Sequence, residues 1–148
     1  IAYMNLIFAG LLLLAYKYRS ASKSLIELTI LGAIFIGVFQ IFALFPGASR
    51  SGTAITAALL IGLNLKDSSR FAFLLAIPTI LGALVFLIGD LALYQANING
   101  VSLIVGFFTS SIFAFLTIKY FLIFVEKIGM YPFVIYRVLL GVFILAII

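Results

Sequence analysis

Apolar runs separated by short polar segments make up almost the whole chain. The runs cover residues 1–16, 26–45, 54–65, 71–89, 101–124 and 131–148. Several of them approach the roughly 20 consecutive apolar residues that a helix needs to cross a bilayer. The pattern therefore predicts an all-α integral membrane protein with transmembrane helices in the longer runs. Pro78 lies inside the 71–89 run and predicts a kink in that helix.

The run at residues 54–65 is too short to cross a membrane by itself. A helix of about 12 residues spans only about 18 Å, whereas the hydrocarbon core is about 30 Å thick. The polar segment before this run contains Pro46 and Gly47. We therefore predict a re-entrant helix pair, in which residues 26–45 enter the membrane, the backbone breaks at Pro46-Gly47, and a half-helix returns to the same side. Irregular backbone at that depth needs protein or a water-filled cavity around it.

The basic residues indicate how the helices are oriented. Seven of them lie in polar segments or near helix ends that the predicted topology places on one side: Lys17, Arg19, Lys23, Lys66, Arg70, Lys119 and Lys127. The segment at residues 90–99 contains no base. This distribution follows the positive-inside rule, so the basic segments are predicted to face the cytoplasm and residues 90–99 the opposite side. A two-pass route through residues 26–65 gives the same charge pattern, and only the short run argues against it.

Composition agrees with a lipid environment and excludes several classes of chemistry. The 148 residues are 66% hydrophobic and only 9% charged, against about 45–50% apolar and about 25% charged in soluble domains. The net charge of +5 comes from bases that are scattered singly, which argues against nucleic-acid binding. The chain has no Cys and no His, so thiolate sites and the commonest general base are missing. Residues 1–148 are predicted to form a single membrane domain.

Candidate chemistry is concentrated in the polar break at residues 46–53. The predicted topology places Arg50 deep in the membrane, where an ionisable residue is costly and is by default a functional candidate. Hydroxyl donors, flexible backbone and the N-terminus of a half-helix starting near Gly52 surround it, and Arg suits bidentate contact with phosphate. The alternative is a kinked loop whose Arg50 snorkels to the surface and whose serines cap a helix. The residues of the predicted anion site are Arg50, Ser49, Ser51, Thr53, Gly47 and Gly52.

Other polar and small residues receive structural interpretations. Gln40 is expected to form an interhelical hydrogen bond rather than to join the site. Asp67 or Ser68 is expected to cap the next helix, with Arg70 beside it at the interface. Arg137 is expected to anchor the last helix at the membrane edge rather than to contact a substrate. Close helix approach is expected at Gly32, Gly37, Ala57 and Ala58.

Three segments resemble the undecaprenyl-diphosphate phosphatase family of the bacitracin-resistance type. The segment Gln40-Ile-Phe-Ala-Leu-Phe-Pro-Gly-Ala-Ser-Arg-Ser-Gly52 resembles the second signature of that family. Residues 71–83 resemble the segment that follows it, and residues 136–141 resemble the closing helix. The resemblance runs through essentially the whole chain and is to the C-terminal half of the family. It implies two inverted repeats, each with a re-entrant helix pair.

The resemblance also implies an activity and its partners. It implies an enzyme of the bacterial inner membrane that hydrolyses undecaprenyl diphosphate to undecaprenyl phosphate. This reaction recycles the lipid carrier for cell-wall synthesis. The predicted catalytic residues are Arg50, Ser49 and Ser51, with Gly47, Gly52 and Thr53 binding substrate. A divalent cation, Mg or Ca, is implied, but its ligands and the base are expected outside this chain, which is therefore expected to be inactive alone. A homodimer is left open.

One departure from the family pattern and one alternative function remain. The family usually has Ala or Ser and then Thr after the last motif glycine, whereas this chain has Thr53 followed by Ala54. Thr53 and Thr56 are therefore both candidates for the role of that threonine.

Broken helices and an anion site are equally typical of a transporter or flippase for an anionic lipid or solute. Phosphate release, set against movement of substrate without hydrolysis, separates the two functions.

Overall fold

The structure is an all-α assembly of long and short helices. The computed structural model describes residues 1–20, 23–93 and 100–147. Its elements are α1 (Ala2–Tyr18), η1 (Leu25–Glu27), α2 (Ile30–Phe39), η2 (Gln40–Leu44), α3 (Arg50–Leu60), α4 (Leu65–Leu93), α5 (Gly100–Ile128) and α6 (Tyr131–Ile147). The described residues form no β-strand, and the isolated bridge between Lys23 and Leu63 joins two connections. The predicted fold class is confirmed.

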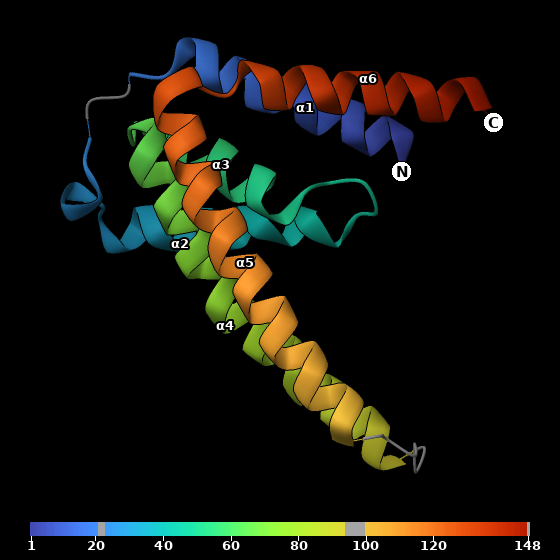
Figure 1. Ribbon diagram of the computed structural model, residues 1–148. Helices are drawn as coiled ribbons and strands as arrows, with labels where there is room; N and C mark the ends of the chain where they lie inside the picture. The colour runs from blue at the N-terminus through green and yellow to red at the C-terminus, as the bar shows by residue number, and fades with distance from the viewer. Residues whose placement is uncertain (21–22, 94–99, 148) are drawn as a thin grey trace.

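The helices fall into three antiparallel pairs (Figure 1). Helices α1 and α6 lie side by side, with both chain termini at the same end of the pair. Helices α4 and α5 form a long hairpin that points away from the rest of the molecule. The shorter pair, α2–η2 and α3, lies between them and ends in the loop at residues 45–49.

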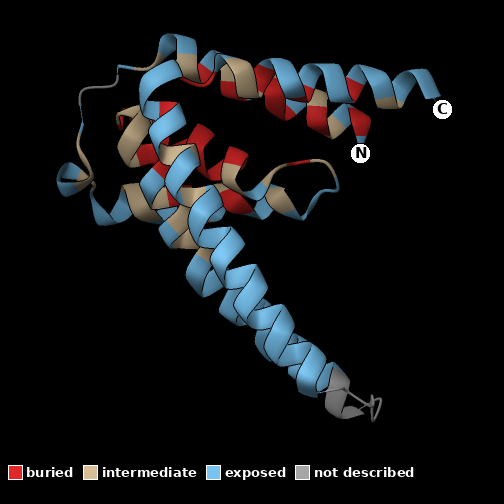
Figure 2. Cartoon of the chain, viewed as in Figure 1, coloured by how far each residue is buried: buried red, intermediate tan, exposed pale blue. Residues whose placement is uncertain are grey.

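Among the described residues, two helices are long and apolar enough to cross a membrane. They cover Leu65–Asp90 and Gly100–Ile128, with mean hydropathy of 2.7 and 2.1 over their most apolar windows. Only 6% and 0% of those windows are buried inside the protein, and the described residues in the far part of the hairpin are exposed (Figure 2). A water-soluble fold would bury such helices. Lipid is therefore the solvent that their side chains fit.

In the helix pair that flanks the Pro46-Gly47 break, the first arm is shorter than the sequence predicts. Residues 26–45 do not form one helix, because Thr29 caps a separate start by accepting a hydrogen bond from the Gly32 N–H at 3.1 Å. The resulting α2 has 10 residues and passes into the 3₁₀-helix η2. At about 1.5 Å per residue, neither α2 nor α3 spans a hydrocarbon core of about 30 Å. The hairpin is as predicted, whereas a single helix over the whole run at residues 26–45 is not observed.

Helix α3 forms the centre of the core. From Gly52 to Leu59 every one of its residues is buried, and it packs against α1, α2 and α4. Ala57 and Ala58 are fully buried, as expected for small residues that let helices approach closely. Gly32 behaves in the same way, because a Cβ there would stand 3.2 Å from the Ile61 side chain. Gly37 was wrongly included, since no atom lies within 4 Å of its missing Cβ.

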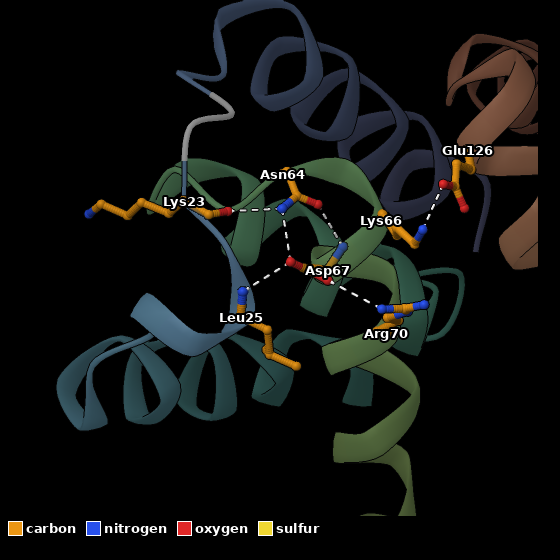
Figure 3. Close-up of polar contacts among 7 residues, drawn as sticks. All are labelled: Lys23, Leu25, Asn64, Lys66, Asp67, Arg70 and Glu126. Carbon is orange, nitrogen blue, oxygen red and sulfur yellow. Dashed lines mark hydrogen bonds and ion pairs between the residues drawn. The ribbon is translucent and has the colours of Figure 1, made fainter.

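Polar contacts tie separate segments together at the end of the molecule where Lys23, Lys66 and Arg70 lie, its basic end (Figure 3). The Asp67 carboxylate accepts hydrogen bonds from the Leu25 N–H at 3.0 Å and from the Asn64 side chain at 2.9 Å. Arg70 forms an ion pair with Asp67 at 3.8 Å, and Lys66 pairs with Glu126 of α5 at 2.7 Å. Three connections that are distant in sequence therefore meet at one end.

Several predicted helix boundaries shift. Neither Asp67 nor Ser68 caps α4; Asn64 does, because its side-chain oxygen accepts the Asp67 N–H at 2.9 Å. Helix α5 continues through Glu126, Lys127 and Ile128, in the polar segment between the last two apolar runs. The chain turns at Gly129, whose φ of +86° is in the left-handed region. Helix α4 likewise continues past Asp90 to Leu93, and the remainder of the predicted polar loop lies outside the described residues.

Candidate functional site

The loop at residues 45–49 reverses the chain and starts α3. Gly47 has a φ of +101°, a conformation that L side chains rarely adopt. The Ala48 N–H donates to the Phe45 carbonyl at 3.0 Å and closes the turn. Ser49 then caps α3, because its hydroxyl oxygen accepts the Gly52 N–H at 3.1 Å. Helix α3 begins at Arg50, two residues earlier than predicted.

The start of α3 presents the polar groups that the sequence singled out. The Ser49 and Ser51 hydroxyls lie 3.3 Å apart and are partly buried. Arg50 is exposed and has no hydrogen bond or ion pair to any other described side chain. The N–H groups of the first helical residues have no partner within the helix, and the helix dipole adds partial positive charge there. Hydroxyls, N–H groups and a guanidinium thus gather at one helix end.

The two threonines of this segment are buried, and their hydroxyl groups bind the backbone of α3 itself. Thr53 is fully buried and its hydroxyl donates to the Arg50 carbonyl at 2.8 Å. Thr56 is buried as well and donates to the Gly52 carbonyl at 2.7 Å. Both hydroxyl hydrogens are therefore engaged by the backbone of α3. A direct contact between substrate and Thr53 stays a prediction, and so does the role of Thr56.

Arg137 of α6 reaches into the same loop, which corrects its expected role as an interface anchor. Its side chain is only 3% exposed, and Nη2 donates to the Gly47 carbonyl at 3.0 Å. Its Nε donates to the Asn5 side-chain oxygen at 2.8 Å. Nη1 is buried without a hydrogen-bond partner among the described residues. A guanidinium in these surroundings cannot snorkel to the membrane surface.

Gly52 is the point at which Arg137 meets the predicted site. A Cβ built on Gly52 would stand 2.7 Å from Arg137 Nη1 and 3.3 Å from the Ser49 hydroxyl oxygen. The absent side chain thus leaves room for a guanidinium beside the first turn of α3. The structure brings Arg137 together with Gly47, Ser49 and Gly52, a grouping that the sequence interpretation missed. A usable signal was present, because Arg137 is a charged residue inside an apolar run, and such a residue is by default a functional candidate.

Gln40 has the structural role that was expected of it. Its amide nitrogen donates to the Thr79 hydroxyl of α4 at 3.1 Å, which ties the 3₁₀-helix η2 to the long hairpin. Pro78 precedes this threonine, and α4 continues through it. The predicted interhelical hydrogen bond is confirmed, whereas a kink at Pro78 stays a prediction.

Three of the four acidic residues make contacts elsewhere, and the acidic residues do not suit a metal centre at this loop. Glu27 accepts hydrogen bonds from the Ser24 N–H and hydroxyl, which hold the pKa of its carboxyl below the ordinary value. Asp67 and Glu126 take part in the contacts at the basic end. No group of three or more acidic side chains that could hold a metal ion occurs in the described ranges. The donor set at the start of α3 suits an anion instead.

Comparison with known proteins finds matches over almost the whole chain. A family model described as bacitracin resistance protein BacA matches residues 1–143. The chain is 44% identical over 142 residues to a protein of Alcanivorax borkumensis named undecaprenyl-diphosphatase, covering 96% of this chain and 54% of that protein. A protein of the same name from Saccharophagus degradans is 45% identical over 141 residues, with coverage of 95% and 53%.

A third relative shows the same proportions. The undecaprenyl-diphosphatase of Ruthia magnifica is 46% identical over 147 residues, covering 97% of this chain and 54% of the relative. The chain therefore spans about half the length of the curated relatives it matches.

Proposed function

Because the chain belongs to the bacitracin resistance protein BacA family, we propose that it supplies the phosphate-binding half of an undecaprenyl-diphosphate phosphatase. The reaction consumes one water and breaks the bond between the terminal phosphorus and the bridging oxygen. Its products are undecaprenyl phosphate and inorganic phosphate. The name shared by the relatives supports this substrate. The anionic head group matches the donors at the start of α3.

The observation that carries the proposal is the arrangement at Ser49–Gly52. Negative charge builds on the phosphoryl oxygens as the phosphoryl group is transferred, so fixed donors aimed at those oxygens lower the barrier. The Arg50 guanidinium is exposed beside partly buried hydroxyls and the positive end of the α3 dipole. In this role Arg50 binds the diphosphate and neutralises its charge, while Ser49 and Ser51 donate hydroxyl hydrogens.

The remaining machinery is not supplied by the described residues. Serine and arginine side chains alone lack a base to activate water, and the carboxylates of Glu27, Asp67 and Glu126 make their contacts away from this loop. The described residues likewise do not fit the divalent cation that the resemblance implies, so no step is derived through it. The printed chain by itself is expected to release no phosphate, and turnover by the purified chain above a buffer blank would contradict this.

We also propose that the protein crosses the bacterial inner membrane several times, with its basic end in the cytoplasm. Two spanning helices and the gathering of basic connections at one end support that orientation. The lipid tail would then stay in the bilayer while the head group reaches the loop at residues 45–52. None of the relatives named above is a transporter, and no feature of the loop favours transport over hydrolysis.

A direct assay tests the function. The protein expressed from its complete gene is reconstituted into liposomes that contain undecaprenyl diphosphate, and released inorganic phosphate is measured together with the loss of the diphosphate. Stoichiometric conversion to the monophosphate is the expected result. Movement of intact diphosphate between leaflets without phosphate release would overturn the proposal and leave a flippase.

A further inference from the structure

We propose that a cavity at the basic end of the molecule binds the phosphodiester head group of an anionic phospholipid. The cavity has a volume of about 370 Å³ and lies between the end of α1, the start of α4 and the end of α5. Such a lipid binds without being hydrolysed, so it is a ligand beyond the substrate of the proposed function. The polar side chains that line the cavity are Tyr16, Arg19, Asn64, Lys66, Glu126 and Lys127.

Positive charge prevails in this cavity. Three bases from three segments line it, namely Arg19 after α1, Lys66 in α4 and Lys127 in α5. The single carboxylate among them, that of Glu126, is already paired, because Lys66 Nζ donates to its Oε1 at 2.7 Å (Figure 3). Neither Arg19 nor Lys127 makes an ion pair with a residue that the structure describes. A phosphate group in the cavity therefore meets two bases whose charges no described carboxylate neutralises.

Arg19 is held at the wall of the cavity with donors left over. Its Nη1 donates to the Tyr16 carbonyl at 2.8 Å, and its guanidinium carbon lies 3.8 Å from the centroid of the Tyr16 ring. Tyr16 is itself fixed, since its ring packs edge-on against that of Tyr131 with centroids 5.0 Å apart. A guanidinium carries more N–H donors than these contacts use. The remaining donors of Arg19 can bind phosphate oxygens, and little side-chain freedom is lost when they do.

The walls of the cavity suit a lipid better than a free phosphate ion. They include the first residues of α4 and the last residues of α5, the two helices long and apolar enough to cross a membrane among the described ones. The cavity therefore lies where these helices leave the hydrocarbon core. Apolar Leu65 and Ile128 line it beside the bases, and Ile128 is exposed. These side chains match the glycerol and upper acyl groups next to a lipid phosphate, and basic pockets between membrane helices on the cytoplasmic side suit anionic head groups.

Helix α1 separates this cavity from the loop that starts α3. Ile1, which precedes α1, lies against Gly47, whereas Tyr16 in the last turn of α1 lines the cavity. At about 1.5 Å per residue, the 17 residues of α1 span about 25 Å. A head group bound in the cavity therefore does not reach Arg50 or the Ser49 hydroxyl, and the two sites can be tested independently.

Thermal unfolding measures the binding. The protein is expressed from its complete gene, purified in an uncharged detergent and titrated with dioctanoyl phosphatidylglycerol, with dioctanoyl phosphatidylcholine as the lipid control. A ligand that binds only the folded state raises the melting temperature with its concentration, so the titration gives an apparent Kd. Phosphatidylglycerol should raise the melting temperature and phosphatidylcholine should raise it far less. Inorganic phosphate at the same concentrations is the third arm and should leave the melting temperature unchanged.

Variants locate the lipid. Lys127 is exposed and makes no ion pair with a described residue, so Lys127→Gln removes a charge without disturbing the fold. Lys127→Gln and Arg19→Gln should each weaken phosphatidylglycerol binding by about fivefold, and the double variant by about 25-fold. Lys23→Gln removes an exposed base at the same end of the molecule but outside the cavity. It serves as the matched control and should leave the affinity unchanged.

Several results would overturn the proposal. Equal stabilisation by the two lipids would show that head-group charge is not recognised, and equal stabilisation by inorganic phosphate would make the site one for a free anion. Unchanged affinity in Lys127→Gln, or equal weakening in Lys23→Gln, would show that the lipid does not bind in the cavity. Arg50→Ala should keep the phosphatidylglycerol affinity, and loss of binding in that variant would place the lipid at the start of α3 instead. None of these measurements requires hydrolysis, so a failure of the proposed function would leave the lipid site standing.

Discussion

Asn5 and Arg137 are joined by two hydrogen bonds although 132 residues separate them in the sequence. The Asn5 amide binds both the backbone carbonyl and the Nε of Arg137, at 2.7 and 2.8 Å. Gly141, one turn further along α6, lets the two helices approach, because its missing Cβ would stand 2.7 Å from the Leu6 side chain. The contact between α1 and α6 thus places a guanidinium against the loop that starts α3.

The pair makes a prediction for stability. Asn5→Leu leaves the Nε group of Arg137 buried without a partner, so the free energy of unfolding should fall by about 1–3 kcal/mol. Adding Arg137→Leu removes the stranded charge, and the double variant should recover part of that loss, since apolar replacement of both partners is often neutral. Thermal unfolding in detergent, followed by circular dichroism, measures the cycle. Strictly additive effects of the two substitutions would show that the side chains are not coupled.

Two glycines of the same helix give a matched test of the core. Gly32→Ala places a methyl group 3.0 Å from Leu28 Cδ1 and 3.2 Å from Ile61 Cδ1, so these side chains must shift and the melting temperature should fall. Gly37→Ala meets no atom within 4 Å and should raise stability by up to about 1 kcal/mol through helix propensity. The same thermal scans compare them. A lower melting temperature for Gly37→Ala than for Gly32→Ala would contradict the packing described for α2 and α3.

The proposed orientation predicts which positions are accessible from each side. The chain contains no Cys, so single cysteines can be introduced at positions 23, 127 and 100 without removing others. A membrane-impermeant maleimide added to intact spheroplasts should label position 100 and spare positions 23 and 127. Lysed spheroplasts serve as the control in which all three positions react. Strong labelling of position 23 or 127 in the intact spheroplasts would reverse the orientation.

The lengths of the apolar runs were enough to predict the helices and the hairpin. They did not predict the residues at which helices end outside the hydrocarbon core. Helix α5 continues through Glu126 and Lys127 because charged residues do not break a helix once it leaves the hydrocarbon core. The division of residues 26–45 was readable in hindsight from Thr29, a good N-cap three residues before Gly32. Gly129, rather than the charges before it, was the signal for the turn.

The candidate site was predictable only as far as it is local. The local part of the site lies within a few residues: Pro46-Gly47, the Ser49 cap and the exposed Arg50. Their order along the chain predicts a break in the backbone followed by the start of a helix. The position of Arg137 depends on how α1 and α6 pack, which the pattern of either run leaves open. Asn5 is a lone amide in an apolar run. Its partner, Arg137, follows only from the packing of α1 against α6.

The central claim is that the start of α3 binds the diphosphate through Arg50, and turnover by Arg50 variants tests it most directly. The measurement is the rate of phosphate release from undecaprenyl diphosphate at saturating substrate, per correctly folded molecule of the protein expressed from its complete gene. Loss of one such donor typically costs about 2.7–4 kcal/mol, or about 10²–10³ in rate. Arg50→Ala should fall by that factor and Arg50→Lys by somewhat less, because Lys keeps the charge without the planar fork. Ser49→Ala and Ser51→Ala should lose less than either. Near-normal turnover by Arg50→Ala would contradict the account.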